Sequence, residues 1–416
     1  MKIIRFCAIT ALLAATPWVQ AQEPSIALKA STVLDGKGKI LHNTVIVIEG
    51  SKITRIGGAI PAGALSYDLA GLTVTPGWID THTHIMYHFL NGRLAGRGEP
   101  PEQAILFGAE NAYATLEAGF TTVQSPGSPE DKYLRDAFAR GIFPGPRVLT
   151  SLQPITNSSL TPDQIREIVR QRKQQGADFI KIFASKSIRE GGEQTMSDAQ
   201  LEAACGEAKS LGLRTIVHAH SASSAKAATL AGCTSIEHGA YVTDDVFNLM
   251  AQHGTYYDPN IGLVLQNYLE NKSKFIGIGN YNEEGFAFMQ KGLQITLDTF
   301  KKALKHKDLK IIYGTDAVAG AHGRNYEEYM VRVRDGGMDP MAALISATSL
   351  SAQSLNLGDQ VGSIAPGMQA DIVGFDGNPL QDVTAARRAV FVMKSGRVVE
   401  NLAHSAKRLE ASESSK

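Results

Sequence analysis

Cysteine and tryptophan are scarce in this chain, with three and two residues among 416. One cysteine, Cys7, lies in an apolar run near the first residue, which leaves only Cys205 and Cys233 in the rest of the sequence. Two cysteines are too few for a disulfide framework in a chain of this length. A single bridge between them is chemically allowed but not indicated. We therefore interpret both as small apolar residues, Cys205 on a helix and Cys233 at the start of a buried strand.

An excess of charge of one sign is also lacking, because 41 lysines and arginines balance 41 aspartates and glutamates. Without a net field, the sequence favours neither a nucleic-acid partner nor an anionic membrane surface. No later apolar run reaches the roughly 20 residues that a membrane-spanning helix needs. We expect a small-molecule substrate, no nucleic acid and no membrane span, and a homo-oligomer is compatible with the sequence.

Motifs for nucleotide binding and for serine hydrolysis are missing as well. No Gly-x-Gly-x-x-Gly opens a helix, no Walker-type loop occurs, and no Gly-x-Ser-x-Gly elbow is present. These absences disfavour an open, doubly wound nucleotide-binding sheet and a serine nucleophile.

The N-terminal residues have the pattern of a secretory signal peptide. Lys2 and Arg5 precede an apolar run over 6–15, and TPWVQAQEP follows with a small-residue cleavage site. We predict a signal peptide over 1–21, cleaved after Ala21, and hence a periplasmic or secreted protein.

The body of the chain divides by its hydrophobic period. Short strands punctuated by glycine occupy 22–75 and return over 357–402, so we expect these two segments to pair into one discontinuous β-sandwich domain. Between them, over 76–356, strands alternate with helical patterns, which is typical of a (β/α)8 TIM-like barrel and gives the α/β fold class. The Ser- and Glu-rich stretch 403–416 is expected to be a flexible tail.

Eight strand candidates fit the eight repeats of a closed barrel. They cover 72–84, 121–124, 147–152, 178–184, 214–218, 234–238, 255–258 and 309–316. Helical patterns lie between them, for example over 101–118, 161–175, 197–211, 221–231 and 243–253. Thr161 and Ser197 are expected helix caps, with Pro162 at the tolerated first helical position.

Residues that can bind metal recur where these strands end, which is where barrel active sites lie. In the sequence TVTPGWIDTHTH, His82 and His84 stand two residues apart, so a strand aims both imidazoles to one side. The remaining candidates come from four later strands: Lys181 lies within the fourth, and the other four, His218, His220, His238 and Asp316, lie at the ends of the fifth, sixth and eighth. Neutral imidazoles and a carboxylate are ligands for a divalent metal.

Lys181 shares the alternating face of Phe179 and Phe183 in a strand that points into the barrel. An unpaired ammonium there is unfavourable. A depressed pKa relieves this, and so does reaction with carbon dioxide to give an anionic carbamate that can bridge two metal ions. The alternative is a lysine that extends to the barrel mouth.

The sequence around these residues resembles the amidohydrolase superfamily, close to its imidazolonepropionase-like and Xaa-Pro dipeptidase branch. The matching stretches are VTPGWIDTHTH, GADFIKIFAS, VHAH, CTSIEHG, YGTDA and VGSIAPGMQADIVGFDG, in this order over nearly the whole chain after the signal peptide. In many such relatives the third strand is followed by a Gly- and His-rich loop, whereas this chain has TSLQPITNSS, so the resemblance does not by itself fix the substrate preference.

The resemblance implies a ligand set. His82, His84 and Asp316 hold the more buried metal, His218 and His238 hold the other, and carboxylated Lys181 bridges them. The cofactors are then two divalent ions, with zinc favoured, manganese, cobalt or iron as alternatives, and a single ion as a further alternative. His218 and His220 can exchange roles. In the preferred assignment His220 and Tyr241 bind substrate.

The expected activity is hydrolysis of a C–N bond in an amide or dipeptide-like substrate with a free carboxylate. A metal-activated hydroxide attacks the carbonyl, and Asp316 serves as general base and then acid. The alternatives are hydrolysis of a cyclic amide or lactone and, in a different class, a catalytically inactive scaffold. Further loop residues that can contact substrate are Lys186, Arg189, Asn260, His322 and Arg324, whereas His88, His253, His306 and His404 are expected in packing or surface roles.

Overall fold

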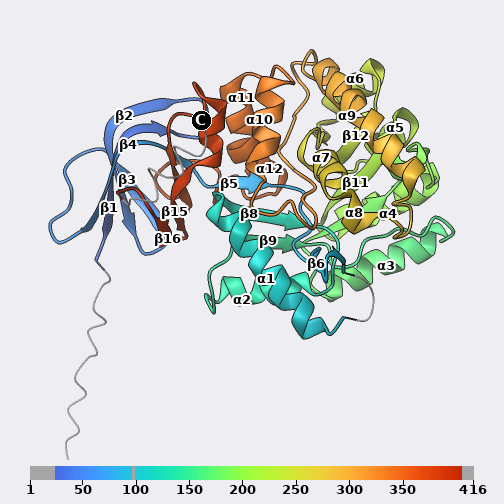
Figure 1. Cartoon of the computed structure of the whole chain (residues 1–416), viewed down its shortest axis with the longest axis horizontal. Helices are drawn as coiled ribbons and strands as arrows, with labels where there is room; N and C mark the ends of the chain where they lie inside the picture. Colours follow the sequence, from blue (N-terminus) through green and yellow to red (C-terminus); the bar gives the residue numbers. More distant parts are fainter. Residues whose placement is uncertain (1–23, 96–98, 405–416) are drawn as a thin grey trace, which may run out of the picture.

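A computed structural model describes residues 24–95 and 99–404. The predicted signal peptide and the tail after residue 404 lie outside the described residues. A twisted sheet of seven strands lies beside a larger body in which helices surround shorter strands (Figure 1). Among the described helices, none has both the length and the apolar character needed to cross a bilayer.

The seven-stranded sheet combines both ends of the chain. Its strands, in spatial order, are β16 (Arg397–Asn401), β15 (Ala389–Lys394), β14 (Ile372–Asp376), β4 (Leu65–Pro76), β1 (Ile26–Leu34), β2 (Ile40–Glu49) and β3 (Lys52–Ile56). The N- and C-terminal segments join where β4 pairs with β14 in antiparallel register. The sheet curls round a shared apolar core, and Ile53 at its edge donates a hydrogen bond to the Met368 carbonyl just before β14. The two terminal segments thus pair, as expected, and they do so within one seven-stranded sheet.

Seven short parallel strands build most of the barrel wall. They are β5 (Trp78–Asp80), β8 (Phe120–Ser125), β9 (Arg147–Thr150), β10 (Phe179–Phe183), β11 (Arg214–Ser221), β12 (Ser235–Tyr241) and β13 (Tyr256–Asp258). Backbone hydrogen bonds pair β5, β8 and β9 in one group and β10 to β13 in another.

Two further contacts close the ring. Ile155, after β9, exchanges hydrogen bonds of 2.9 Å with the backbone of Lys181 and Phe183 in β10. On the other side, the segment 309–317 bonds to β13 through Tyr257 and to the chain after β5, where the Asp316 amide donates to the His82 carbonyl at 2.6 Å. This segment is the eighth strand position, and the predicted (β/α)8 architecture is confirmed.

Two predicted strands need correction. The stretch predicted as one strand over 72–84 is two elements, β4 in the large sheet and β5 in the barrel, separated by Gly77. A side chain at Gly77 would clash with Thr121, because a Cβ there would lie 2.0 Å from its Oγ1. The predicted strand over 309–316 makes only isolated bridges at Ile311 and Ala317, and its backbone turns at Asp316, where φ is 52°.

The predicted helices agree with the structure to within about one residue at each end. They are α1 (Pro101–Glu117), α3 (Pro162–Gln174), α4 (Asp198–Ser210), α5 (Ala222–Leu230) and α6 (Asp244–His253). Thr161 and Ser197 form capping boxes with the glutamines three residues later, so local sequence defines where α3 and α4 begin.

The remaining elements cover the barrel and its rim. The helices are α2 (Asp131–Ala139), α7 (Leu263–Glu270), α8 (Lys272–Phe275), α9 (Glu283–Ala303), α10 (Tyr326–Arg334), α11 (Pro340–Ile345) and α12 (Ser351–Ser354). Short helical turns η1 (Ile188–Glu190), η2 (Ser346–Leu350) and η3 (Val383–Arg387) and the small hairpin of β6 (Phe89–Leu90) and β7 (Arg93–Leu94) complete the described part.

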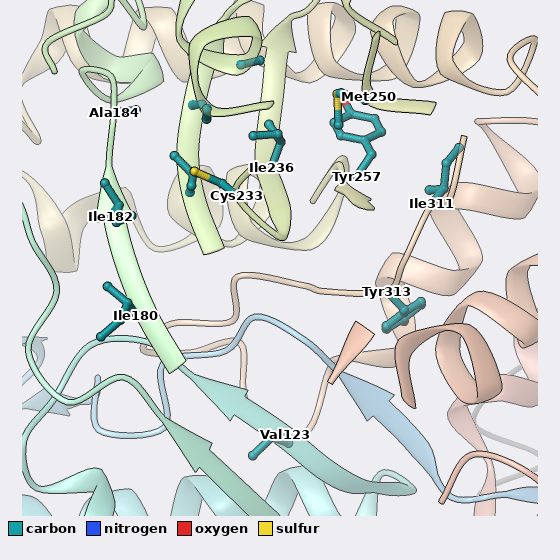
Figure 2. Close-up of a cluster of buried hydrophobic side chains, with 14 of the residues drawn as sticks. Val123, Ile180, Ile182, Ala184, Cys233, Ile236, Met250, Tyr257, Ile311 and Tyr313 are labelled. Carbon is teal, nitrogen blue, oxygen red and sulfur yellow. The ribbon is translucent and has the colours of Figure 1, made fainter. Parts of the chain in front are cut away.

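The interpretation of the two cysteines as separate apolar residues was wrong. Cys205 on α4 and Cys233 just before β12 form a disulfide, with Cα atoms 5.2 Å apart. Both belong to the barrel's main hydrophobic cluster, and Figure 2 shows Cys233 among its side chains. The pairing was missed because 28 residues separate them and only the packing of α4 beside the strands brings them together.

Candidate active site

One cavity of about 400 Å³ lies at the C-terminal ends of the barrel strands. It is the position at which barrel enzymes place their active sites. The seven residues predicted at strand ends all line this cavity: His82, His84, Lys181, His218, His220, His238 and Asp316. The structure therefore brings together side chains that are up to 234 positions apart in the sequence, from 82 to 316.

The first group, which we call the aspartate triad, consists of His82, His84 and Asp316. Asp316 Oδ1 lies 3.1 Å from His84 Nε2 and 3.5 Å from His82 Nε2. One ligand atom from each residue falls within 4.8 Å of the other two, which is a spacing that a single metal ion can span.

The second group, which we call the histidine triad, consists of His218, His220 and His238. Its ring centroids are 4.6 to 4.9 Å apart, and one nitrogen from each ring lies within 4.8 Å of the others. His238 also lies 5.2 Å from His82, ring centre to ring centre, so the two triads are adjacent. The geometry keeps both His218 and His220 as ligand candidates.

Lys181 lies beside the aspartate triad on the barrel interior. Its Nζ is 3.2 Å from His82 Nε2, and its side chain is only 1% exposed. No carboxylate of the described residues lies within 4.0 Å of this nitrogen. Burial lowers the pKa of Lys181, which favours the neutral amine that can react with carbon dioxide.

The backbone is strained where the site is built. Four of the eight described non-glycine residues with positive φ lie at the barrel rim: His238 (69°) within β12, and Asn260 (46°), Asp316 (52°) and Leu152 (57°) at or just beyond a strand position. Such angles are unfavourable for side chains with a Cβ and persist where surrounding structure holds them. At His238 the turn breaks strand alternation, so that both His238 and its neighbour Glu237 are buried in the barrel.

Four histidines of the site, His82, His218, His220 and His238, are held in the neutral form that binds metal. Burial, followed by nearby positive groups, lowers the pKa of His82, His218 and His238 well below the usual value. The pKa of His220 falls to about 3, because of burial first and then the charges of Arg189 and Lys181. Burial works against ionisation of Asp316, but His82 and His84 outweigh it and lower its pKa, so the carboxylate is ionised at neutral pH.

Charged residues beneath the site were missed by the sequence analysis. Glu237 Oε2 lies 2.9 Å from His82 Nδ1, and fully buried Arg332 lies between Asp258 at 3.4 Å and Glu328 at 3.0 Å. Burial raises the pKa of both Glu237 and Asp258. Glu237 thus lies behind His82, where metal-binding histidines often have a carboxylate, but the contact lacks hydrogen-bond geometry, since neither His82 Nδ1 nor Glu237 Oε2 has a hydrogen-bond partner among the described residues. Its position next to His238 in EHG was the available signal.

The donor set fits divalent metal ions. Buried Nδ1 atoms of His84 and His220 have no hydrogen-bond partner in the described part of the chain. Buried polar atoms need partners. A buried cluster of neutral imidazoles with a single carboxylate is therefore unfavourable unless a bound ion supplies those partners. Imidazole and carboxylate ligands suit zinc and similar ions.

The predicted substrate-binding residues divide into two sets. Lys186, Arg189, His220 and Asn260 line the cavity, whereas Tyr241, His322 and Arg324 are not among its lining residues. Gly192 lies against both His220 and Tyr241. A Cβ at this glycine would be 2.6 Å from the Cβ of His220 and 3.2 Å from the tyrosine ring. Arg324 is bound to Glu270 and Glu327.

The histidines away from strand ends occupy other places. His88 is buried, stacks on Phe107 and lies 2.9 Å from Glu99. His306 contacts Asp244, and His404 contacts the Asp68 carbonyl.

The fold and the site together define a class: a closed (β/α)8 barrel that presents two groups of metal-type ligands at its C-terminal rim. The chain belongs to the amidohydrolase family, whose model matches residues 73–402, and this confirms the resemblance seen in the sequence. The family is generally metal-dependent, in agreement with the ligand groups found here.

Three relatives illustrate the similarity. An ochratoxinase of Aspergillus niger is 27% identical over 246 residues, 57% of this chain and 49% of the relative, so the match spans about half of that protein. An imidazolonepropionase of Fusobacterium nucleatum is 24% identical over 400 residues, 82% of this chain and 87% of the relative. A solved Xaa-Pro dipeptidase with bound methionine in its active site is 30% identical with a TM-score of 0.82, covering 91% of this chain and all of that one.

Proposed function

We propose that this protein is a metal-dependent hydrolase of C–N bonds in amide or dipeptide-like substrates that carry a free carboxylate. The observation that carries the proposal is the convergence of the aspartate triad, the histidine triad and Lys181 on one cavity at the barrel rim. Its similarity to a Xaa-Pro dipeptidase and an ochratoxinase supports the same bond type.

Two ions, with zinc favoured, are proposed to bind at the two triads. The aspartate triad would hold one ion, His218 and His238 the other, and a carbamate on Lys181 would link them. When bound, such ions lower the pKa of water and polarise a carbonyl. The burial of Lys181 and the missing carboxylate in the histidine triad support an added anion at this position.

Asp316 is the proposed proton carrier. It is the only carboxylate among the seven residues, and it is partly open to the cavity while His82 and His84 hold its Oδ1. Being ionised, it can accept a proton from the attacking water and return it to the leaving amine. His220 is proposed to face the substrate, and a substrate-binding role for Tyr241 stays a prediction.

We further propose that the protein acts outside the cytoplasm. The predicted signal peptide over 1–21 supports this, and so does the Cys205–Cys233 disulfide, because such bonds persist in oxidising compartments. Fractionation of the producing cells, with the mass of the mature N terminus, tests this. A chain that keeps residues 1–21 in the cytoplasmic fraction contradicts it.

The decisive experiment combines metal analysis with a hydrolysis screen. The purified mature protein is analysed for bound metals and tested on dipeptides, N-acyl amino acids, cyclic amides and lactones. We expect one to two divalent ions per chain, turnover of amides with a free carboxylate, and loss of turnover on chelation that zinc restores. Metal-loaded protein that hydrolyses none of these substrates contradicts the proposed function, and turnover of lactones alone changes the bond type.

A further inference from the structure

The cavity has a second wall that the proposed chemistry does not use. Arg189 on η1, after β10, faces Tyr268 on α7 and the loop residues Asn280 and Tyr281 before α9, and all four line the cavity. The wall is therefore built from two loops that follow different barrel strands. In barrel enzymes such loops select the substrate.

The guanidinium of Arg189 is fixed in this wall. Its Nε donates a hydrogen bond of 2.9 Å to Asn280 Oδ1, and its Cζ lies 4.2 Å from the Tyr281 ring and 5.5 Å from the Tyr268 ring. The two tyrosines are joined by a hydrogen bond of 3.1 Å between their hydroxyls. Stacking of this kind orients an arginine while leaving its terminal nitrogens for another partner.

Arg189 has no direct ion-pair partner in the described part of the chain. No described carboxylate lies within 4.0 Å of it, whereas Lys186 on the same rim is 2.8 Å from Glu193 and Arg324 binds two glutamates. The residue that holds Arg189 is a neutral amide, Asn280, whose own Nδ2 donates to Glu190 at 2.6 Å, so this carboxylate is linked to the guanidinium only through the amide.

The size of the cavity limits the distance between a substrate group bound by Arg189 and the bond that would be hydrolysed at the metal ligands. A volume of about 400 Å³ is near the lower end of small-molecule sites, so the metal ligands and Arg189 must contact neighbouring parts of one small substrate. Apolar side chains, Ile188, Val264 and Leu265, also line it.

Resting on the proposed function, we propose that Arg189 binds the α-carboxylate of the residue released as the amine product, so that the substrate class is N-acyl amino acids and dipeptides with an apolar C-terminal residue. Its two terminal nitrogens match a carboxylate in a bidentate pair. Asn280 and the two tyrosines are positioning residues that hold the guanidinium. A substrate with a blocked C terminus lacks the partner for this charge.

The test compares N-acetyl-leucine with N-acetyl-leucine amide as substrates. We expect wild type to prefer the free acid by about 100-fold in kcat/KM, the usual range for a hydrogen bond to a charged group. Arg189→Gln should raise KM for the acid by roughly 30-fold to 100-fold, leave kcat within about 3-fold, and leave the amide substrate unchanged. Arg166→Gln on the outer surface of α3 is the matched charge-loss control.

A second variant keeps the arginine. Asn280→Asp places a carboxylate against Nε and should raise KM for the acid by about 10-fold, because the guanidinium then has an internal partner. If kcat/KM for the acid and for the amide falls by the same factor in either variant, the residue has a structural role and the proposal is overturned. Equal turnover of acid and amide by wild type also overturns it, together with the free-carboxylate requirement of the proposed function, while metal-dependent hydrolysis of a C–N bond stands.

Calorimetric titration with L-leucine separates the two proposals, because it needs no turnover. Binding to wild type that is lost in Arg189→Gln, with unchanged thermal unfolding, supports the carboxylate receptor even if neither substrate is hydrolysed. That combination would contradict the proposed function alone. Equal binding to both proteins, or no binding to wild type, overturns the role of Arg189.

Discussion

The two triads of the cavity differ in charge and in how the chain builds them. The aspartate triad joins the first and last strand positions of the barrel and contains a carboxylate, with Glu237 behind His82. The histidine triad comes from the neighbouring strands β11 and β12 and contains only imidazoles. The first can therefore balance part of a divalent charge itself, whereas the second depends on an anion from elsewhere, for which a carbamate on Lys181 is the proposed source.

The strongest test of this difference is to remove the only carboxylate. Asp316→Asn keeps the shape of the aspartate triad but removes its charge and the proposed proton acceptor. We expect kcat to fall by about 1,000-fold, within the range for loss of a general base, while the folded barrel is retained. Steady-state kinetics and circular dichroism measure this, with exposed Asp163→Asn as control. Substantial remaining activity would contradict the role of Asp316.

The next test removes the proposed bridge between the triads. Lys181→Met keeps an unbranched buried side chain but cannot form a carbamate. We expect roughly 100-fold lower activity and one metal ion per chain instead of two, lost from the histidine triad. Elemental analysis and kinetics measure this, with exposed Lys173→Met as control. In wild type, reloading of metal-free protein should depend on bicarbonate, and unchanged loading in its absence argues against the carbamate.

Within the histidine triad, a matched pair of variants tests whether His218 or His220 is the metal ligand. His218→Asn should lower metal content by about one ion, whereas His220→Asn should keep the metal and raise KM by about 10-fold through a lost substrate contact. Exposed His253→Asn serves as control, and metal content is measured beside KM. The reverse pattern would exchange the roles of the two residues.

Acid should destabilise the metal-free protein through its buried histidines. The unfolded state takes up a proton near the ordinary pKa of 6.5, whereas folded His220 does so only near about 3. Stability from this group is therefore complete above pH 6.5 and decreases as pH falls towards 3, by about 1.4 kcal/mol per pH unit. Urea unfolding of chelator-treated protein at several pH values measures this. Bound zinc should reduce this loss of stability. A free energy of unfolding that does not change with pH would contradict the burial of His220 in its neutral form.

The smallest effect on activity is expected from the disulfide that flanks the histidine triad. Strand β11 lies between Cys205 and Cys233 in sequence, whereas no residue of the aspartate triad does. Replacing both cysteines with alanine should lower the free energy of unfolding by about 3 to 4 kcal/mol, as expected for a loop of this length. Activity should change little at room temperature. The disulfide is expected to act locally on the histidine triad. If the variant lost metal from the aspartate triad before the histidine triad, this expectation would be contradicted.

Local signals in the sequence carried most of the architecture. The capping residues Thr161 and Ser197 defined helix starts, and the alternation of strands with helices indicated the barrel, because both depend on neighbouring residues. The errors fell where distant residues decide. Gly77 divides one apolar run between two sheets because Thr121 packs against it, and the eighth strand position is irregular around Asp316.

The site shows the same division. Ligand-type residues at strand ends were visible in the sequence because parallel strands of a barrel end on the same rim. Glu237, Asp258 and Arg332 were not, since their importance comes from burial beneath that rim. Tyr268 on α7 and the loop residues Asn280 and Tyr281 were missed because no periodicity in the sequence indicates how this segment passes over the cavity.

By itself, the sequence determined the barrel, the paired terminal β segments and the set of seven candidate ligands, because hydrophobic period, caps and strand-end chemistry are local properties. Only the tertiary structure decided that Cys205 meets Cys233, that Lys181 lies beside His82, and that Arg189 lines the cavity, the last two with no described carboxylate within 4.0 Å of their charged groups. These are facts about which side chains share a low-dielectric space, and that depends on the packing of segments far apart in the chain.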